Sequence, residues 1–112
     1  MYSYRDFVFI GDVIDALKKA ANTPKIEDEI FNIGSGKATS IKKIVDTSIK
    51  LVKKKPQIEW NSNNPRSMDK FQTRSFSDLK KSEKLLKWKP STSLEKGLEN
   101  SYLWYKKNSN LY

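Results

Sequence analysis

Short apolar runs and amphipathic helical segments alternate along this chain, and the alternation restricts the fold to the α/β class. Runs of β-forming residues predict strands at four places, residues 7–10, 30–33, 57–60 and 71–76. Apolar residues at helical spacing predict four helices, over about 12–21, 40–53 and 78–86 and from 92 onward. The order β-α-β-α-β-β-α-α indicates a small sheet with mixed strand directions.

Polar residues mark where these helices begin and end. Asp12 is predicted to cap the first helix, and Thr39 or Ser40 the second, because short polar side chains accept hydrogen bonds from the free N–H groups of a helix start. The spacing Thr92-Ser-Leu-Glu95 is that of a capping box. Pro56 prevents the second helix from continuing.

The run from Phe7 to Ile10 is apolar at every position, which is typical of a strand covered on both faces. A chain of 112 residues with four short strands and four helices has little material to cover such strands. We therefore expect this chain to be one part of a larger α/β body. The irregular polar stretch 61–70 is a connecting loop long enough to carry a function.

Composition excludes several kinds of chemistry. The chain has no cysteine and no histidine, so it cannot form disulfides, Cys/His zinc sites, thiolate nucleophiles or imidazole-based catalytic triads. No apolar run approaches the roughly 18 residues of a membrane span, and the N-terminal residues show no signal-peptide pattern. The sequence predicts a cytoplasmic protein.

The chain carries 22 Lys and Arg residues against 13 Asp and Glu residues, a net charge of +9, which favours anionic partners. Most of these cations are lysines on the predicted helix faces, where charge is usually solvated. The three arginines, Arg5, Arg66 and Arg74, lie outside the predicted helices. Because arginine binds phosphate in a bidentate manner, they are the candidate anion-binding residues.

Two short motifs have a functional and a structural interpretation. Residues 32–36, Asn-Ile-Gly-Ser-Gly, stand where a phosphate-binding loop would lie, but Thr39 replaces the third glycine of the dinucleotide fingerprint, which favours a plain turn. Tyr102 and Lys106 have the Tyr-x-x-x-Lys spacing of short-chain dehydrogenases. Without a dinucleotide loop in the chain, the aromatic flank of an amphipathic helix is favoured.

A third pair, Arg66 and Asp69, ends the polar loop. An arginine and an aspartate three positions apart can form a local ion pair. They can equally bind a ligand, with Arg66 on a diphosphate and Asp69 on a ribose hydroxyl. The residues alone leave both interpretations open.

The motifs together resemble those of NAD-dependent nucleotide-sugar epimerases and dehydratases, which are extended short-chain dehydrogenases. Residues 5–16 resemble the family segment R-D-F-V-(Y/F)-V-x-D-V-x-x-A, and residues 30–36 resemble (V/I)-(Y/F)-N-(V/I)-G-(S/T)-G. Residues 65–69 resemble P-R-x-x-D, and residues 77–90 and 93–105 resemble the family's closing motifs. The main departures are Lys87 and Met68, which stand where the family commonly has glycine.

The resemblance implies that residues 1–106 form the C-terminal, nucleotide-sugar-binding region of such an enzyme, with a frayed tail at 107–112. Arg5 and Arg66 match arginines near the substrate diphosphate, and Asp69 matches a residue that contacts the nucleotide ribose. The family's Gly-rich NAD loop and catalytic residues belong to an N-terminal Rossmann part that nothing here matches. We therefore expect no catalytic, NAD-binding or metal-binding residue in this chain, no activity of the chain alone, and NAD only in the complete enzyme.

Two other functions compete with this one. A basic chain could be a nucleic-acid-binding module, but no Arg-rich arm, paired RNP-like aromatic motif or zinc finger is present. It could also be an assembly domain without a ligand. Epimerase, dehydratase and epimerase-reductase stay open within the family. An isolated chain with uncovered apolar strands is expected either to self-associate or to rearrange its strands.

Overall fold

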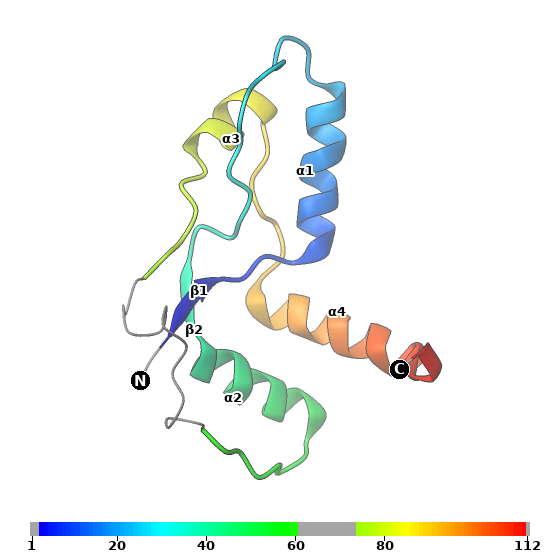
Figure 1. The fold of residues 1–112 in the computed structure, drawn as a ribbon. Coiled ribbons are helices and arrows are strands. Elements are labelled where there is room, and N and C mark those ends of the chain that lie inside the picture. Colours follow the sequence, from blue (N-terminus) through cyan, green and yellow to red (C-terminus); the bar gives the residue numbers. More distant parts are fainter. Residues whose placement is uncertain (1–2, 61–73, 112) are drawn as a thin grey trace.

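The computed structural model describes residues 3–60 and 74–111 of the chain. A two-stranded antiparallel ribbon at its centre pairs β1 (Tyr4–Asp6) with β2 (Ala38–Ser40), so that Arg5 lies opposite Thr39. The helices flank this ribbon in two pairs (Figure 1). They are α1 (Ile10–Asn22), α2 (Ile41–Val52), α3 (Lys80–Leu86) and α4 (Leu94–Lys107), followed by a short 3-10 helix at Ser109–Leu111.

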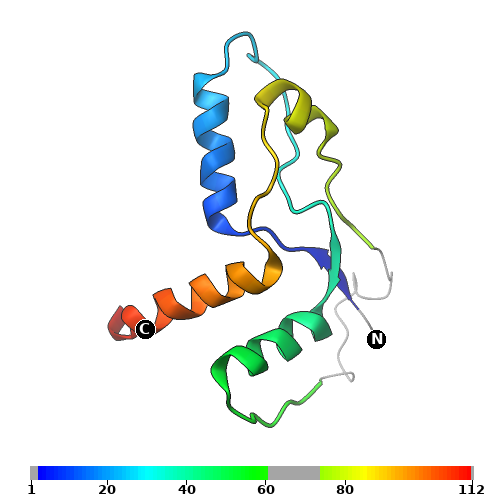
Figure 2. The same cartoon turned by 180° about the vertical axis from the view of Figure 1, so that it is seen from behind.

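The molecule is open and flat, with extents of 51 × 38 × 22 Å. Helices α1 and α3 lie on one side of the ribbon, and α2 and α4 lie on the other, which Figure 2 shows from behind. Within residues 3–60 and 74–111, no helix combines the length and the apolar character needed to cross a bilayer.

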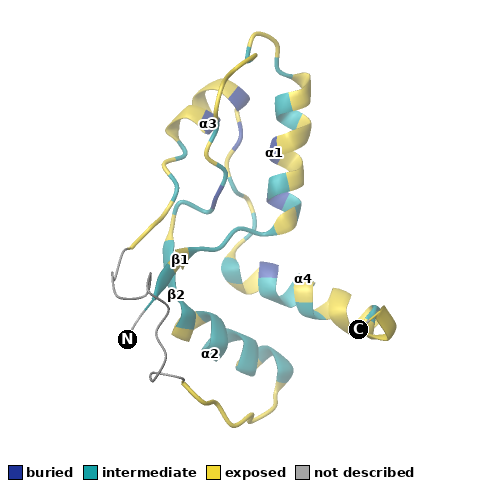
Figure 3. Cartoon of the chain, in the orientation of Figure 1, coloured by how far each residue is buried: buried dark blue, intermediate teal, exposed yellow. Residues whose placement is uncertain are grey.

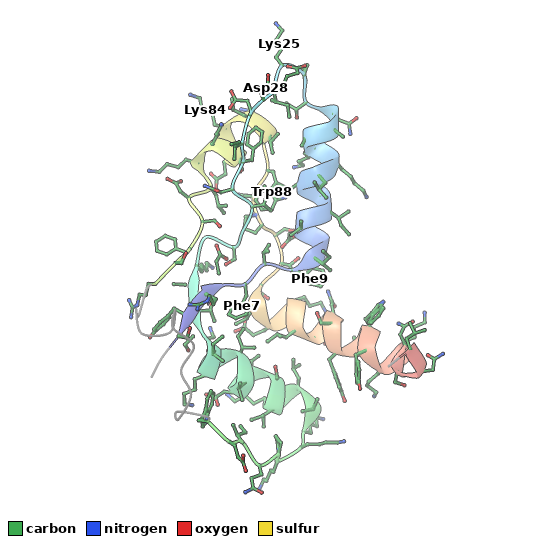
Figure 4. The ribbon with its side chains drawn as sticks, viewed as in Figure 1. Phe7, Phe9, Lys25, Asp28, Lys84 and Trp88 are labelled. Atoms are coloured by element: carbon green, nitrogen blue, oxygen red, sulfur yellow. The ribbon has the colours of Figure 1, made fainter. Side chains whose placement is uncertain are left out.

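A small apolar core lies between α1 and α3. Its fully buried members are Ala16, Leu86 and Trp88, and Trp88 is only 1% exposed (Figures 3 and 4). The indole Nε1 of Trp88 donates to the main-chain oxygen of Asp12 at 3.0 Å, so the one polar atom of this ring has a partner in the apolar surroundings. This core fixes the segment after α3 against α1.

The predicted α/β class with four helices is confirmed, whereas the predicted strand positions are wrong. Residues 7–9 lead into α1, and residues 30–33 and 57–60 are not paired with any strand among the described residues. Of the fourth predicted strand, 71–73 fall outside the described residues and 74–76 form no strand. An apolar run signals burial, but a strand also needs a neighbouring strand to pair its backbone N–H and C=O groups. The described part of the chain has no such neighbour for these runs.

The helix starts also differ in part from the prediction. Ser40 caps α2 as expected, and its side chain accepts from the Lys43 N–H at 3.1 Å. Phe9 rather than Asp12 is the capping residue of α1, because the Asp12 carboxylate is turned toward another segment. Ser93 rather than Thr92 caps α4, accepting from Lys96 N–H at 3.2 Å.

Lys87, one of the two departures from the family pattern, ends α3 in a left-handed conformation with φ 52° and ψ 36°. This geometry suits glycine, and in other residues the Cβ crowds the following carbonyl oxygen at a cost of roughly 1–2 kcal/mol. The chain therefore ends α3 in the left-handed conformation even though lysine stands where the family commonly has glycine. The Lys87 carbonyl oxygen also accepts from Lys19 Nζ at 2.9 Å, which ties the turn to α1.

We predict that Lys87→Gly stabilises the chain by about 0.5–1 kcal/mol, because relief of the left-handed strain exceeds the added entropy of the unfolded chain. Urea denaturation followed by tryptophan fluorescence measures the change. Lys84→Gly, within α3, is the matched control and should destabilise by about 1 kcal/mol. Equal destabilisation by both variants would contradict the prediction.

Candidate functional site

The carboxylate of Asp6, at the end of β1, collects hydrogen bonds from two distant segments. Oδ1 accepts from the Ser35 N–H at 2.7 Å and from the Ser35 hydroxyl. Oδ2 accepts from the N–H groups of Gly36 at 3.2 Å and Ser77 at 2.9 Å. One side chain thereby joins β1, the turn at 34–36 and the segment before α3. We call this set of hydrogen bonds around a carboxylate a carboxylate joint.

These donors keep Asp6 ionised. Partial burial raises the pKa of this carboxyl, but the hydrogen bonds from Ser35, Ser77 and Gly36 outweigh burial and hold the pKa below the ordinary aspartate value. Gly34 makes room for the arrangement, because a Cβ at this position would lie 2.5 Å from Asp6 Oδ2 and would also strike the Ser77 hydroxyl. The joint therefore requires both the carboxylate and the glycine.

An open hollow of about 410 Å³ lies beside this joint. Its lining consists of Arg5 and Asp6 from β1, Asn32, and residues 75–78. Apart from the ring of Phe76, these are polar or charged side chains. The hollow offers one guanidinium together with amide and hydroxyl groups, which can bond to phosphate and hydroxyl oxygens, and its lining also contains the carboxylates of Asp6 and Asp78.

The predicted site residues have different outcomes. Arg5 lines the hollow, and its Nη1 donates to the main-chain oxygen of Tyr4 at 2.7 Å. Arg66 and Asp69 lie outside the described residues. Arg74 is engaged with Tyr4, because its guanidinium carbon lies 4.6 Å from the centre of the tyrosine ring.

The two short motifs have structural roles. In residues 32–36, the N–H groups of Ser35 and Gly36 donate to Asp6, so the amides that a phosphate would need already serve a carboxylate of the same chain. Gly36 has a φ of 71°, as a turn glycine does. Lys106 Nζ lies 5.7 Å from the centre of the Tyr102 ring on α4, which fits the aromatic flank.

A second carboxylate joint was not predicted. Asp12, 5% exposed, accepts from the Ser91 hydroxyl at 3.0 Å, from the Thr92 N–H at 3.0 Å and from the Thr92 hydroxyl at 3.1 Å. Burial raises its pKa, but the hydrogen bonds from Thr92 and Ser91 more than offset burial, so the pKa lies below the ordinary value. The signal in the sequence is an aspartate close to an apolar run, because a carboxylate that becomes buried must find hydrogen-bond donors.

No group of three or more acidic side chains able to hold a metal ion occurs within 3–60 and 74–111.

The family model for GDP-mannose 4,6 dehydratase matches residues 1–101, and the chain belongs to this family. A UDP-glucuronate 4-epimerase of Thermodesulfobacterium geofontis is 35% identical over 108 residues, which covers 96% of this chain and 32% of that protein. The resemblance to NAD-dependent epimerases and dehydratases is confirmed.

Two solved structures extend the comparison. An epimerase of Methanothermobacter thermautotrophicus superposes with a TM-score of 0.85 at 25% identity, over 97% of this chain and 32% of that one. A variant UDP-glucuronic acid 4-epimerase of Bacillus cereus, solved with UDP-4-deoxy-4-fluoro-glucuronic acid and NAD, superposes with a TM-score of 0.79 at 30% identity, over 98% of this chain and 33% of that one. The chain spans about a third of the length of these relatives.

We predict that acid destabilises the chain through Asp12 and Asp6. Because their pKa values are lower in the folded chain than in the unfolded one, their stabilising contribution is complete above pH 4 or so and is lost as the pH falls through the folded values. Urea denaturation at a series of pH values should show this decline in the free energy of unfolding.

Asp12→Asn should be less stable than the wild type at pH 7 and should lose less stability on acidification. Asp15→Asn, on the exposed face of α1, is the control and should keep the slope of the wild type. The prediction is wrong if Asp12→Asn has that slope as well.

Proposed function

We propose that residues 1–106 are the nucleotide-sugar-binding region of an NAD-dependent nucleotide-sugar epimerase or dehydratase of the cytoplasm. The observation that carries the proposal is the polar hollow beside Arg5, in a chain that belongs to this family. Its guanidinium suits a diphosphate, and the Asn32, Ser75 and Ser77 side chains around it can bond to phosphate or ribose oxygens. Arg66 and Asp69 complete the proposed substrate-binding set.

In the complete enzyme, bound NAD would oxidise a carbon of the sugar reversibly. The part of this chain is to hold the diphosphate and ribose so that the hexose faces the nicotinamide, which uses binding energy remote from the reacting carbon. The turn at 34–36 does not fit the pyrophosphate of NAD, because its amides donate to Asp6. NAD and the catalytic residues therefore belong to an N-terminal Rossmann part, and the chain alone lacks activity.

An apolar face supports this division. Ile10, Ile14 and Leu17 are spaced to lie on one face of α1, and they are 63%, 45% and 65% exposed. Ile30, in the extended segment after α1, is 82% exposed. A face this apolar is costly in water, and we propose that the N-terminal Rossmann part covers it. Without that part, the same face would drive self-association.

The net charge of +9 is the observation behind the nucleic-acid alternative, and the ion pairs of the described residues weigh against it. Lysines on all four helices form exposed ion pairs with acidic side chains, which reduces the positive field that a phosphate backbone would meet. The pairs are Lys19–Asp15, Lys42–Asp46, Lys43–Glu95, Lys81–Glu29 and Lys96–Glu99.

Calorimetric titration of the chain with UDP, GDP and dTDP tests the proposal. We expect one nucleotide to bind and Arg66→Ala and Arg5→Ala to weaken it at least about tenfold each, because each removes a charged hydrogen-bond donor to phosphate. Lys50→Ala removes the same charge from an exposed position on α2 and should leave the affinity unchanged. Indifference of the chain to all three nucleotides would count against the proposal.

Sedimentation measurements test the apolar face. We expect the isolated chain to self-associate, and Leu17→Gln to weaken the association at least about tenfold, because burial of a leucine contributes about 1.5–3 kcal/mol. Lys18→Gln, the neighbouring exposed position, should not change it. A monodisperse wild-type monomer with a cooperative melt would refute the role of this face.

A further inference from the structure

Asp6 is part of the lining of the hollow and joins three segments of the chain. The residue itself belongs to β1, its Oδ1 accepts from Ser35, and its Oδ2 accepts from Gly36 and Ser77. Each oxygen thus has two donors, and the carboxylate has no capacity left for another strong donor. A group used in this way does not bind a ligand but fixes the elements around it.

The joined elements are those that carry the proposed ligands of the diphosphate. Arg5 directly precedes Asp6 in β1, so the position of the Asp6 carboxylate also sets the backbone of Arg5. Ser77 belongs to residues 75–78, which line the hollow together with Arg5. The hydrogen bond from Ser77 to Asp6 therefore links the two described segments that bear proposed substrate contacts.

We propose that Asp6 is a positioning residue of the nucleotide-sugar site, which holds β1 with Arg5 and the segment at 75–78 in one fixed arrangement. The inference rests on the proposed function. Pre-orientation of the two segments matters because they would otherwise become ordered only when the diphosphate binds. The entropic cost of that ordering would lower the affinity.

A carboxylate suits this position better than its amide. The four donors are three N–H groups and one hydroxyl, and an asparagine has a single oxygen to accept from them. Whichever way the amide turned, its NH₂ group would face at least one backbone N–H. Asp6→Asn should therefore keep part of the joint, whereas Asp6→Ala should lose all of it.

Gly34 allows an independent test, because Gly34→Ala leaves the carboxylate in place. The added Cβ would lie 2.5 Å from Asp6 Oδ2 and would also meet the Ser77 side chain, so these groups would have to move away from residue 34, which should disturb the hydrogen bonds of Asp6. This variant should act as Asp6→Ala does on the site. Asp15→Ala, which removes an exposed carboxylate from α1, is the matched control.

The experiment combines titration with UDP and with uridine and amide hydrogen exchange of the same chain measured by NMR. We expect Asp6→Ala and Gly34→Ala to weaken UDP about tenfold, Asp6→Asn to weaken it less, and all three to weaken uridine by a smaller factor than UDP, because uridine lacks the diphosphate that Arg5 is proposed to meet. The Ser77 amide should exchange at least about tenfold faster, while amides in the middle of α2, such as that of Val45, should not change.

The outcomes separate the two proposals. If Arg66→Ala abolishes UDP binding but Asp6→Ala does not weaken it, the positioning role is refuted and the proposed function stands. Equal losses for UDP and uridine would mean general destabilisation and would also refute it. If the wild type binds no nucleotide, the proposed function fails, and the positioning role for that site fails with it. Exchange at Ser77 then decides whether Asp6 joins the two segments at all.

Discussion

The hydrogen bonds of two carboxylates hold together segments that the small apolar core does not reach. Asp6 joins β1 to the turn at 34–36 and to Ser77, and Asp12 joins α1 to the residues that lead into α4. Both carboxyls are held below the ordinary aspartate pKa by their donors. With only Ala16, Leu86 and Trp88 as buried apolar residues among those described, such charge-assisted contacts add to the apolar core in holding distant segments together.

The helices could be predicted from the sequence because their signals are local. An amphipathic stripe and a cap such as Ser40 depend on residues a few positions apart. The strands could not be predicted, because an apolar run such as residues 30–33 indicates that the segment will be buried but does not indicate which other segment it will pack against. In the described residues this segment pairs with no strand. Phe31 and Ile33 pack against the core, whereas Ile30 is exposed, in a chain that spans about a third of its relatives.

Only part of the candidate site could be predicted, because contacts between residues far apart in the sequence leave no local signal. Arg5 stood out because arginine is scarce here and lies outside the helices, and it does line the hollow. The role of Asp6 was missed because its donors, Ser35, Gly36 and Ser77, lie far away in the sequence. Resemblance to the family identified the motif that contains this aspartate without indicating what its carboxylate contacts. Arg66 and Asp69 belong to residues that the structure does not describe, so their proposed role in substrate binding rests on the sequence alone.

The ribbon at the centre has a consequence for how this region can vary. In a strand, side chains alternate between faces, so a shift of the β1–β2 register by one residue would turn Arg5 to the opposite face. Ser40 is both the last residue of β2 and the cap of α2, so the same shift would carry that helix along. Insertions and deletions should therefore be excluded from both strands. The exposed turn that contains Lys25 and Asp28, distant from the ribbon in Figure 4, should tolerate a change of length better than the strands, as long as Ile26 keeps its place against the core.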